Sequence, residues 1–118
     1  ENLARHVKRR LGIESVRVVG DFDRMVTKVG TIIGGIGQKY NATEGIIDLG
    51  GEVAILGEMI DYTARYAVEA GIPLIETDHM ATEIPGVLGV VEVLRQAFPG
   101  LPVEYLDTGI PWQFINRD

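Results

Sequence analysis

The stretch VAILGEMIDYTARYAVEAGIPLI, residues 53–75, decides the fold class. Val53–Leu56 is a short apolar segment typical of a buried strand, and residues 73–75 begin a second one. Between them, residues 60–70 carry apolar side chains at helical spacing, and Gly71 predicts the end of that helix. Short apolar strands separated by helices indicate a mainly parallel sheet with helices on both faces.

The same alternation continues on both sides of this stretch. We expect helices over residues 2–11 and 87–98, a helix beginning at residues 41–44, and strands over residues 15–19, 25–33 and 103–106. The tail from residue 108 onward is expected to be loop-like. The sequence therefore predicts one α/β lobe over residues 1–118, a layered sandwich with a mixed, mainly parallel sheet. Ligands of such a sheet gather at the carboxyl ends of its strands.

Composition excludes several classes of function. The 118 residues include no cysteine, which removes disulfides, thiolate metal sites and a cysteine nucleophile. Seventeen acidic against eleven basic residues give a net charge of -6, so the phosphates of nucleic acids would be repelled. No apolar run reaches the roughly 20 residues that span a bilayer, so we expect no membrane segment, and the absence of cysteine is compatible with a reducing cytoplasm. Because the chain begins at Glu1 without a methionine, we expect a piece of a longer protein.

The segment ETDHMATEIPG, residues 76–86, is the densest functional signal. Proline is tolerated only in the first turn of a helix, so Pro85 predicts a helix that begins near Thr82 as its N-cap residue. His79 would then lie in the loop after a strand and Glu83 in the first helical turn, both facing one point. Imidazole nitrogen and carboxylate oxygen suit zinc, manganese or iron, so both side chains are predicted metal ligands. The alternative is a surface histidine beside an acid that the helix dipole favours.

Three motifs in this order resemble those of a known family. The segment TDHMATE, residues 77–83, with Gly86 and Val87 behind it, is similar to the His-Tyr-Ala-Thr-Glu signature of the GTP cyclohydrolase 1 type 2 homologs, also called Nif-three-like proteins. Residues 29–35 resemble the family's strand that ends in a glycine-rich loop, and ILGE, residues 55–58, resembles its strand ending in Thr-Gly-Asp or Thr-Gly-Glu. The resemblance covers nearly all of this chain but only the C-terminal half of a family member.

The resemblance implies a site of two divalent metal ions (zinc, iron or manganese) to which His79 and Glu83 contribute ligands. The other ligands, two histidines and an aspartate, would lie in an N-terminal lobe of the same protein. It also implies hydrolase activity of the GTP cyclohydrolase type and a ring-like homo-oligomer such as a hexamer. Tyr105 and Trp112 provide aromatic surface that suits such an interface. The sequence departs from the family's usual residues at four positions: Leu56, Tyr62, Asp78 and Met80.

Two alternative functions stay open at this point. Gly34–Gln38 follows a strand, and Glu58 stands about twenty residues further on, a partial match to the fingerprint of a Rossmann-like nucleotide-binding module. Tyr40 occupies the place of that fingerprint's third glycine. The chain can equally belong to a non-enzymatic, metal-dependent binding or scaffold protein. Glu58 and Asp61 both lie near a strand end, where they either approach the metal site or merely begin a helix.

Overall fold

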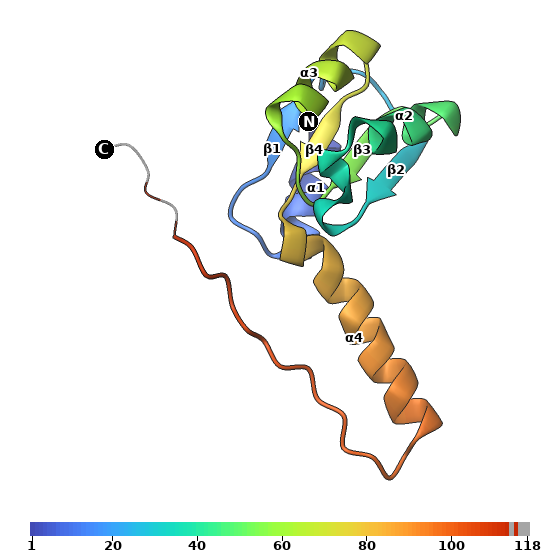
Figure 1. The fold of residues 1–118 in the computed structure, drawn as a ribbon, viewed down its shortest axis with the longest axis vertical. Coiled ribbons are helices and arrows are strands. Elements are labelled where there is room, and N and C mark those ends of the chain that lie inside the picture. Colours follow the sequence, from blue (N-terminus) through green and yellow to red (C-terminus); the bar gives the residue numbers. More distant parts are fainter. Residues whose placement is uncertain (114, 116–118) are drawn as a thin grey trace. The chain divides into compact units, whose positions relative to one another are not determined.

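The computed structural model describes residues 1–113 and residue 115. Two compact units make up the chain, Glu1–Gly86 and Val87–Asp118. The first unit contains a four-stranded sheet, and the second begins within the longest helix and continues into the tail (Figure 1). In the part of the chain that the structure describes, no helix is long and apolar enough to cross a membrane.

The sheet of the first unit is mixed and mainly parallel, as predicted. Its spatial order is β1-β4-β3-β2, and β2, β3 and β4 run parallel while β1 pairs antiparallel with β4. The strands are β1 (Arg17–Val19), β2 (Val29–Ile32), β3 (Val53–Leu56) and β4 (Leu74–Glu76). The three parallel strands therefore place their carboxyl ends at one edge of the sheet.

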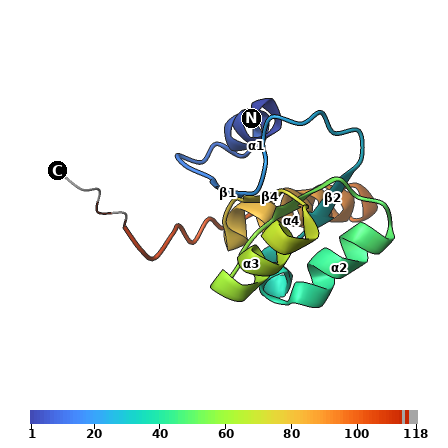
Figure 2. The same cartoon turned by 90° about the horizontal axis from the view of Figure 1, so that it is seen from above.

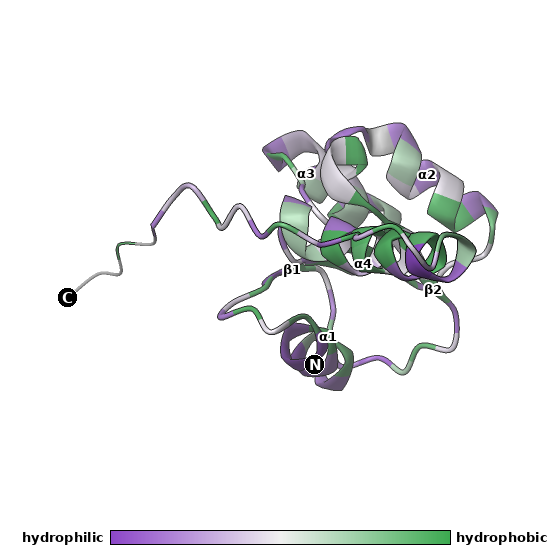
Figure 3. Cartoon of the chain, turned by 90° about the horizontal axis from the view of Figure 1, so that it is seen from below, coloured by the Kyte–Doolittle hydropathy of each residue, from purple (hydrophilic) through white to green (hydrophobic). Residues whose placement is uncertain are grey.

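Helices cover both faces of this sheet, which confirms the predicted layered sandwich. Figure 2 shows α1 on one face and α2 and α3 on the other. The helical elements are α1 (Asn2–Leu11), the 3₁₀ helix η1 (Gly34–Gln38), α2 (Tyr40–Asp48), α3 (Asp61–Ala70) and α4 (His79–Ala97). α1 is mostly hydrophilic along its length (Figure 3), and its buried residues are Ala4 and Val7.

Successive residues of β3 point to opposite faces and so supply both halves of the core. Val53, which is 3% exposed, packs with the buried Ala4 of α1 and Ile75 of β4. Ala54 and Leu56, both 0% exposed, pack on the other face with residues of α2 and α3. A strand buried on both faces requires a continuous apolar segment, which explains why this part of the sequence is so distinctive.

The prediction for the start of the last helix is wrong. α4 begins at His79, and its cap is Asp78, whose Oδ1 accepts hydrogen bonds from the backbone N–H groups of Met80 at 2.9 Å and Ala81 at 3.3 Å. Pro85 is consequently the seventh helical residue. Its missing N–H removes one helical hydrogen bond, but the capped turn before it is already closed.

Two predicted strands also differ from the structure. Residues 103–106 form no strand, because the second unit offers them no neighbouring strand among the residues described; Val103 instead accepts a hydrogen bond from Arg95 Nε at 3.0 Å. The strand expected from residue 25 begins only at Val29. Met25 is 91% exposed, so it contributes nothing to the sheet.

Candidate functional site

Three loops meet at the carboxyl edge of the parallel strands. They follow β2, β3 and β4, and backbone hydrogen bonds tie them together: Glu58 N–H donates to the Gly34 carbonyl at 3.1 Å, and Thr77 N–H donates to the Leu56 carbonyl at 2.9 Å. These are the three places that the sequence singled out. The parallel arrangement brings them together although about twenty residues separate one from the next.

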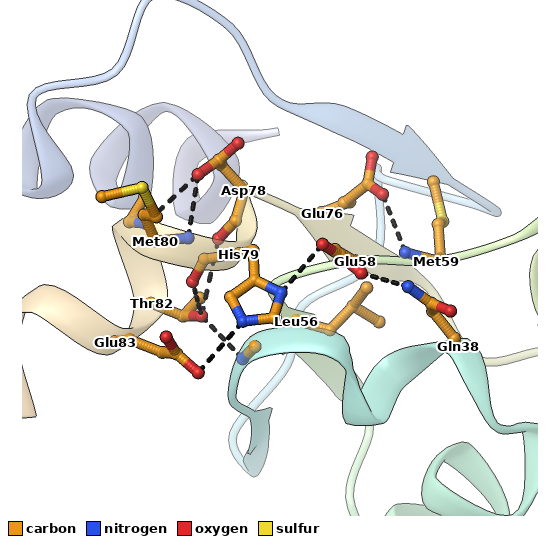
Figure 4. A network of polar contacts seen from close by, with 12 residues as sticks. Gln38, Leu56, Glu58, Met59, Glu76, Asp78, His79, Met80, Thr82 and Glu83 are labelled. Atoms are coloured by element: carbon orange, nitrogen blue, oxygen red, sulfur yellow. Dashed lines mark hydrogen bonds and ion pairs between the residues drawn. The ribbon is translucent and has the colours of Figure 1, made fainter. Parts of the chain in front are cut away.

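His79 lies between two carboxylates at this edge (Figure 4). Its Nδ1 lies 2.8 Å from Glu58 Oε1, and its Nε2 lies 3.2 Å from Glu83 Oε1. The side chains of His79, Glu58 and Glu83 are 39%, 33% and 46% exposed, so the group is half open to solvent. Because His79 and Glu83 are four residues apart in α4, the helix itself places them on one face.

The electrostatics of this group favour a cation beside the imidazole. The hydrogen bond to Glu58 raises the pKa of His79 above its ordinary value, opposed by partial desolvation and reinforced by the charge of Glu83. When the imidazole is neutral and donates from Nδ1, its Nε2 is a lone-pair acceptor that faces another acceptor, Glu83 Oε1. A proton on Nε2 relieves this opposition, and so would a metal ion held by both atoms.

Glu58 joins the site, whereas Asp61 does not. The Oε2 atom of Glu58 accepts a hydrogen bond from Gln38 Nε2, at the end of η1. Asp61 instead pairs with Arg65 one turn further along α3, with Oδ2 2.8 Å from Nε. The sequence marks Gln38 as the end of a glycine-rich loop but assigns it no role at the site; its position at that strand end is the signal that points to it.

Glycines let the loop after β2 approach these side chains. Gly34 has a positive φ of 60°, and a Cβ there would lie 2.5 Å from Glu83 Oε1 and 3.2 Å from His79 Nε2. A Cβ on Gly35 would lie 3.3 Å from Glu58 Oε2. The glycine run therefore serves to press the backbone against the His–Glu group.

Thr82 connects that loop to the helix. Its Oγ1 donates to the His79 carbonyl at 2.8 Å and accepts from the Gly34 N–H at 2.9 Å. This hydroxyl thus fixes the loop of β2 against the first turn of α4, which is a different role from the predicted N-cap.

The same geometry argues against the nucleotide-binding alternative. A phosphate cradle needs free backbone N–H groups in a region without negative charge. Here the N–H of Gly34 is bonded to Thr82, and the Glu58 and Glu83 carboxylates stand against the glycine run. Phosphate would meet two like charges at this loop.

Few side chains of the described residues can act together as metal ligands. Among the residues described, no group of three or more histidine, cysteine, aspartate or glutamate side chains is arranged to hold a metal ion. Glu58 bonds the Nδ1 edge of the ring and Glu83 faces the Nε2 edge, so the two carboxylates do not converge on one point with Nε2. The other histidine of this chain, His6, is exposed on α1.

Fold and site together define a class: an α/β sandwich lobe that presents a histidine–glutamate pair at the carboxyl edge of its parallel strands. Residues 1–109 match the family described as Duf34/NIF3 (NGG1p interacting factor 3), and the chain belongs to that family. This confirms the resemblance found in the sequence.

Curated relatives carry the same family name that the sequence suggested. The chain is 33% identical over 84 residues to a GTP cyclohydrolase 1 type 2 homolog of Bacillus subtilis, covering 71% of this chain and 22% of the relative. It is 32% identical over 80 residues to the protein of that name from Staphylococcus aureus, covering 67% of this chain and 21% of the relative. The matched part thus spans about a fifth of these relatives' length.

Solved structures show the same fold. A hypothetical protein of Staphylococcus aureus superposes with a TM-score of 0.79 at 28% identity, covering 97% of this chain and 38% of that one. A protein called ybgI, described as of unknown function, gives 0.79 at 27% identity, with 94% and 43% covered. A Bacillus cereus protein related to NIF3 gives 0.73 at 26% identity, with 97% and 32% covered.

Proposed function

We propose that this chain is the lobe of a longer, two-lobed protein that contributes His79 and Glu83 to a divalent-metal site. Membership of the Duf34/NIF3 family suggests a metal-associated function. The observation that carries the proposal is the pairing of His79 Nε2 and Glu83 Oε1, two lone-pair atoms 3.2 Å apart on one helical face.

The residues fit a metal ion in three respects. Nitrogen and oxygen donors suit zinc, iron and manganese. Two atoms that each bind one ion at about 2.0 to 2.2 Å can stand 3.2 Å apart. The side of the pair toward Gly34 is kept free of any side chain, since a Cβ there would enter the space beside both donor atoms.

Two ligands leave a metal ion mostly solvated, so the proposal includes ligands from outside this chain. We expect them in an N-terminal lobe, as two histidines and an aspartate, and we expect a pair of ions. Two bound ions would supply a hydroxide at neutral pH and polarise a substrate. The residues of this chain hold, orient and charge-balance that site, consistent with a hydrolase of the GTP cyclohydrolase type. The proposed setting is a cytoplasmic homo-oligomer.

Elemental analysis of the full-length protein tests the proposal. His79→Ala and Glu83→Ala should each lower the bound zinc, iron or manganese per chain while the circular dichroism spectrum stays unchanged. His6→Ala is the matched control, because it removes the other histidine from an exposed helix face. Unchanged metal content in both site variants would contradict the proposal.

A non-enzymatic metal-dependent scaffold is the second candidate, and the half-open, solvent-exposed pair is compatible with it. A comparison of substrate turnover separates the two. If the full-length protein hydrolyses GTP and His79→Ala abolishes that turnover while His6→Ala does not, the enzyme is supported. Metal binding without turnover would support the scaffold.

A further inference from the structure

We propose that Glu58 is a positioning residue that holds His79 as the Nδ1–H tautomer, with the Nε2 lone pair turned toward Glu83. The inference rests on the proposed metal site and adds a residue that is not itself a ligand. Its basis is the 2.8 Å contact between Glu58 Oε1 and His79 Nδ1, on the ring edge opposite to Glu83 (Figure 4).

A ligand histidine must present an unprotonated nitrogen to the metal. In a neutral imidazole either nitrogen can carry the proton, and the hydrogen bond made by the other nitrogen decides which one does. Both carboxylates are acceptors only, but Glu58 lies closer to its ring nitrogen, at 2.8 Å against 3.2 Å for Glu83, so a neutral ring keeps its proton on Nδ1 and leaves Nε2 unprotonated. The Glu58 carboxylate also fixes the ring's rotation and raises its basicity as a ligand.

Glu58 is well placed for this because it is held on both sides. Gln38 Nε2 donates a hydrogen bond to the second carboxylate oxygen of Glu58. The backbone N–H of Glu58 donates to the Gly34 carbonyl at 3.1 Å. The next residue, Met59, donates its N–H to the buried carboxylate of Glu76 at 2.8 Å. Glu76 is in turn paired with Arg17, its neighbour across β1 and β4.

These contacts connect the sheet to the proposed metal site. Arg17 and Glu76 fix the backbone after β3, that backbone presents Glu58, and Gln38 selects the direction of its carboxylate. Glu58 then orients His79. If the contact between Glu58 and His79 only stabilised the fold, the tautomer of the His79 ring would not matter. The proposed role requires Glu58 to determine which ring nitrogen carries the proton.

The first test measures metal affinity in the full-length protein, by competition of bound zinc with a chelator. Glu58→Ala should weaken zinc binding by roughly 10- to 100-fold, the usual effect of losing such a partner. Glu58→Gln should lose less, because its amide oxygen can still accept from Nδ1–H. Glu69→Ala, an exposed residue of α3, should leave the affinity unchanged.

The second test reads the tautomer directly, without metal. Nitrogen-15 NMR of the metal-free full-length protein, at a pH where imidazoles are neutral, should show His79 as the Nδ1–H form, with the His79 signals assigned by their loss in His79→Ala. Glu58→Ala should shift His79 toward the Nε2–H form. Glu83→Ala should lose zinc affinity yet keep the Nδ1–H form.

The positioning role of Glu58 and the proposed metal site are contradicted by different results. An unchanged His79 tautomer in Glu58→Ala, or zinc affinity equal to that of the unmodified protein, would overturn the positioning role. Zinc binding that survives His79→Ala would instead overturn the proposed metal site, and the tautomer result would then describe only a structural hydrogen bond.

Discussion

At the scale of single residues, Asp78 combines backbone strain with a capping hydrogen bond. Its φ of 153° lies in a region that favours glycine. The aspartate side chain compensates by accepting from the N–H groups of Met80 and Ala81 at the start of α4. The same turn that carries His79 is therefore held in place by a side chain that glycine lacks.

Asp78 variants can separate the strain from the cap. Asp78→Ala keeps the strained backbone but removes the cap, so it should lower the free energy of unfolding by about 0.5 to 2 kcal/mol. Asp78→Asn retains an acceptor oxygen and should cost much less. Urea unfolding of both variants decides this, and an equal loss in both would show that the cap contributes nothing.

Gly34 gives a second prediction at this scale. Gly34→Ala should destabilise about as much as Gly12→Ala, by about 1 to 2 kcal/mol, because both have a positive φ near 65°. A new methyl at Gly12 meets open space, whereas at Gly34 it meets the flexible end of Glu83. That carboxylate can swing aside, so only Gly34→Ala should also weaken metal binding. Unfolding and zinc competition on the two variants measure both effects, and equal zinc affinity would contradict the account.

At the scale of elements, Glu52 ties the start of β3 to the segment that enters β2. Its carboxylate accepts hydrogen bonds from the backbone N–H groups of Thr27 and Lys28, and its own N–H donates to the Lys28 carbonyl at 2.9 Å. The bond from Thr27 N–H, followed by that from Lys28 N–H, lowers the pKa of Glu52. The charged form of this side chain is therefore the one that stabilises the fold.

This lowered pKa predicts a pH dependence. The contribution of the Glu52 carboxylate to the free energy of unfolding is fully present above the unfolded pKa of about 4.3. It is lost as the pH falls through the lower pKa of the folded state. Glu52→Gln should therefore be less stable than the unmodified protein at pH 7, and the difference should shrink in acid. Urea unfolding midpoints of both proteins, measured at pH 7 and in acid, check this. A stability difference between the two proteins that stays constant down to low pH would contradict it.

Sequence patterns predicted some elements well and others poorly, for physical reasons. α1 and β3 have the predicted bounds, because each carries a strong local signal: Gly12 in the left-handed conformation for the first, and a short apolar strand for the second. The sequence predicts too late a start for α4, because Pro85 signals a first helical turn, whereas the side chain of Asp78 caps the helix well before it. Residues 103–106 have strand-like composition, but strand formation depends on a partner that local sequence cannot reveal.

The candidate site was partly predictable for similar reasons. His79 and Glu83 are close in sequence, so a motif can reveal them. Glu58 and Gln38 lie on other loops, and only the parallel order of β2, β3 and β4 brings Glu58 to His79 and Gln38 to Glu58. Whether Glu58 or Asp61 joins the site depends on where α3 begins, and the pairing of Asp61 with Arg65 is visible only in the structure.

At the scale of the whole molecule, the second unit presents an apolar surface that a soluble monomer seldom exposes. Its exposed hydrophobic residues include Val87, Leu88, Val90, Val93, Phe98, Leu101 and Leu106. Trp112, expected at an interface, is 48% exposed, and Tyr105 is partly buried. We expect the rest of the protein or a second copy to cover this surface.

Light scattering on the full-length protein at micromolar concentration tests the proposed homo-oligomer and should report a molar mass of more than one copy. Val93→Glu places a charge on the apolar helix and should lower the molar mass if copies of the protein meet there. Glu92→Gln is a neighbouring control that should leave the mass unchanged. A lower stability of Val93→Glu at unchanged mass would assign the surface to contact within one chain, and a monomer in every form would contradict the oligomer.

The central claim is that His79 and Glu83 share a metal ion, and anomalous diffraction from crystals of the full-length protein tests it most directly. Data collected at the absorption edge of the bound metal should show a peak about 2.0 to 2.2 Å from His79 Nε2 and from a carboxylate oxygen of Glu83. Glu58 should remain bonded to Nδ1, without contact to the peak. A peak elsewhere in the protein, with none beside these two atoms, would contradict the account.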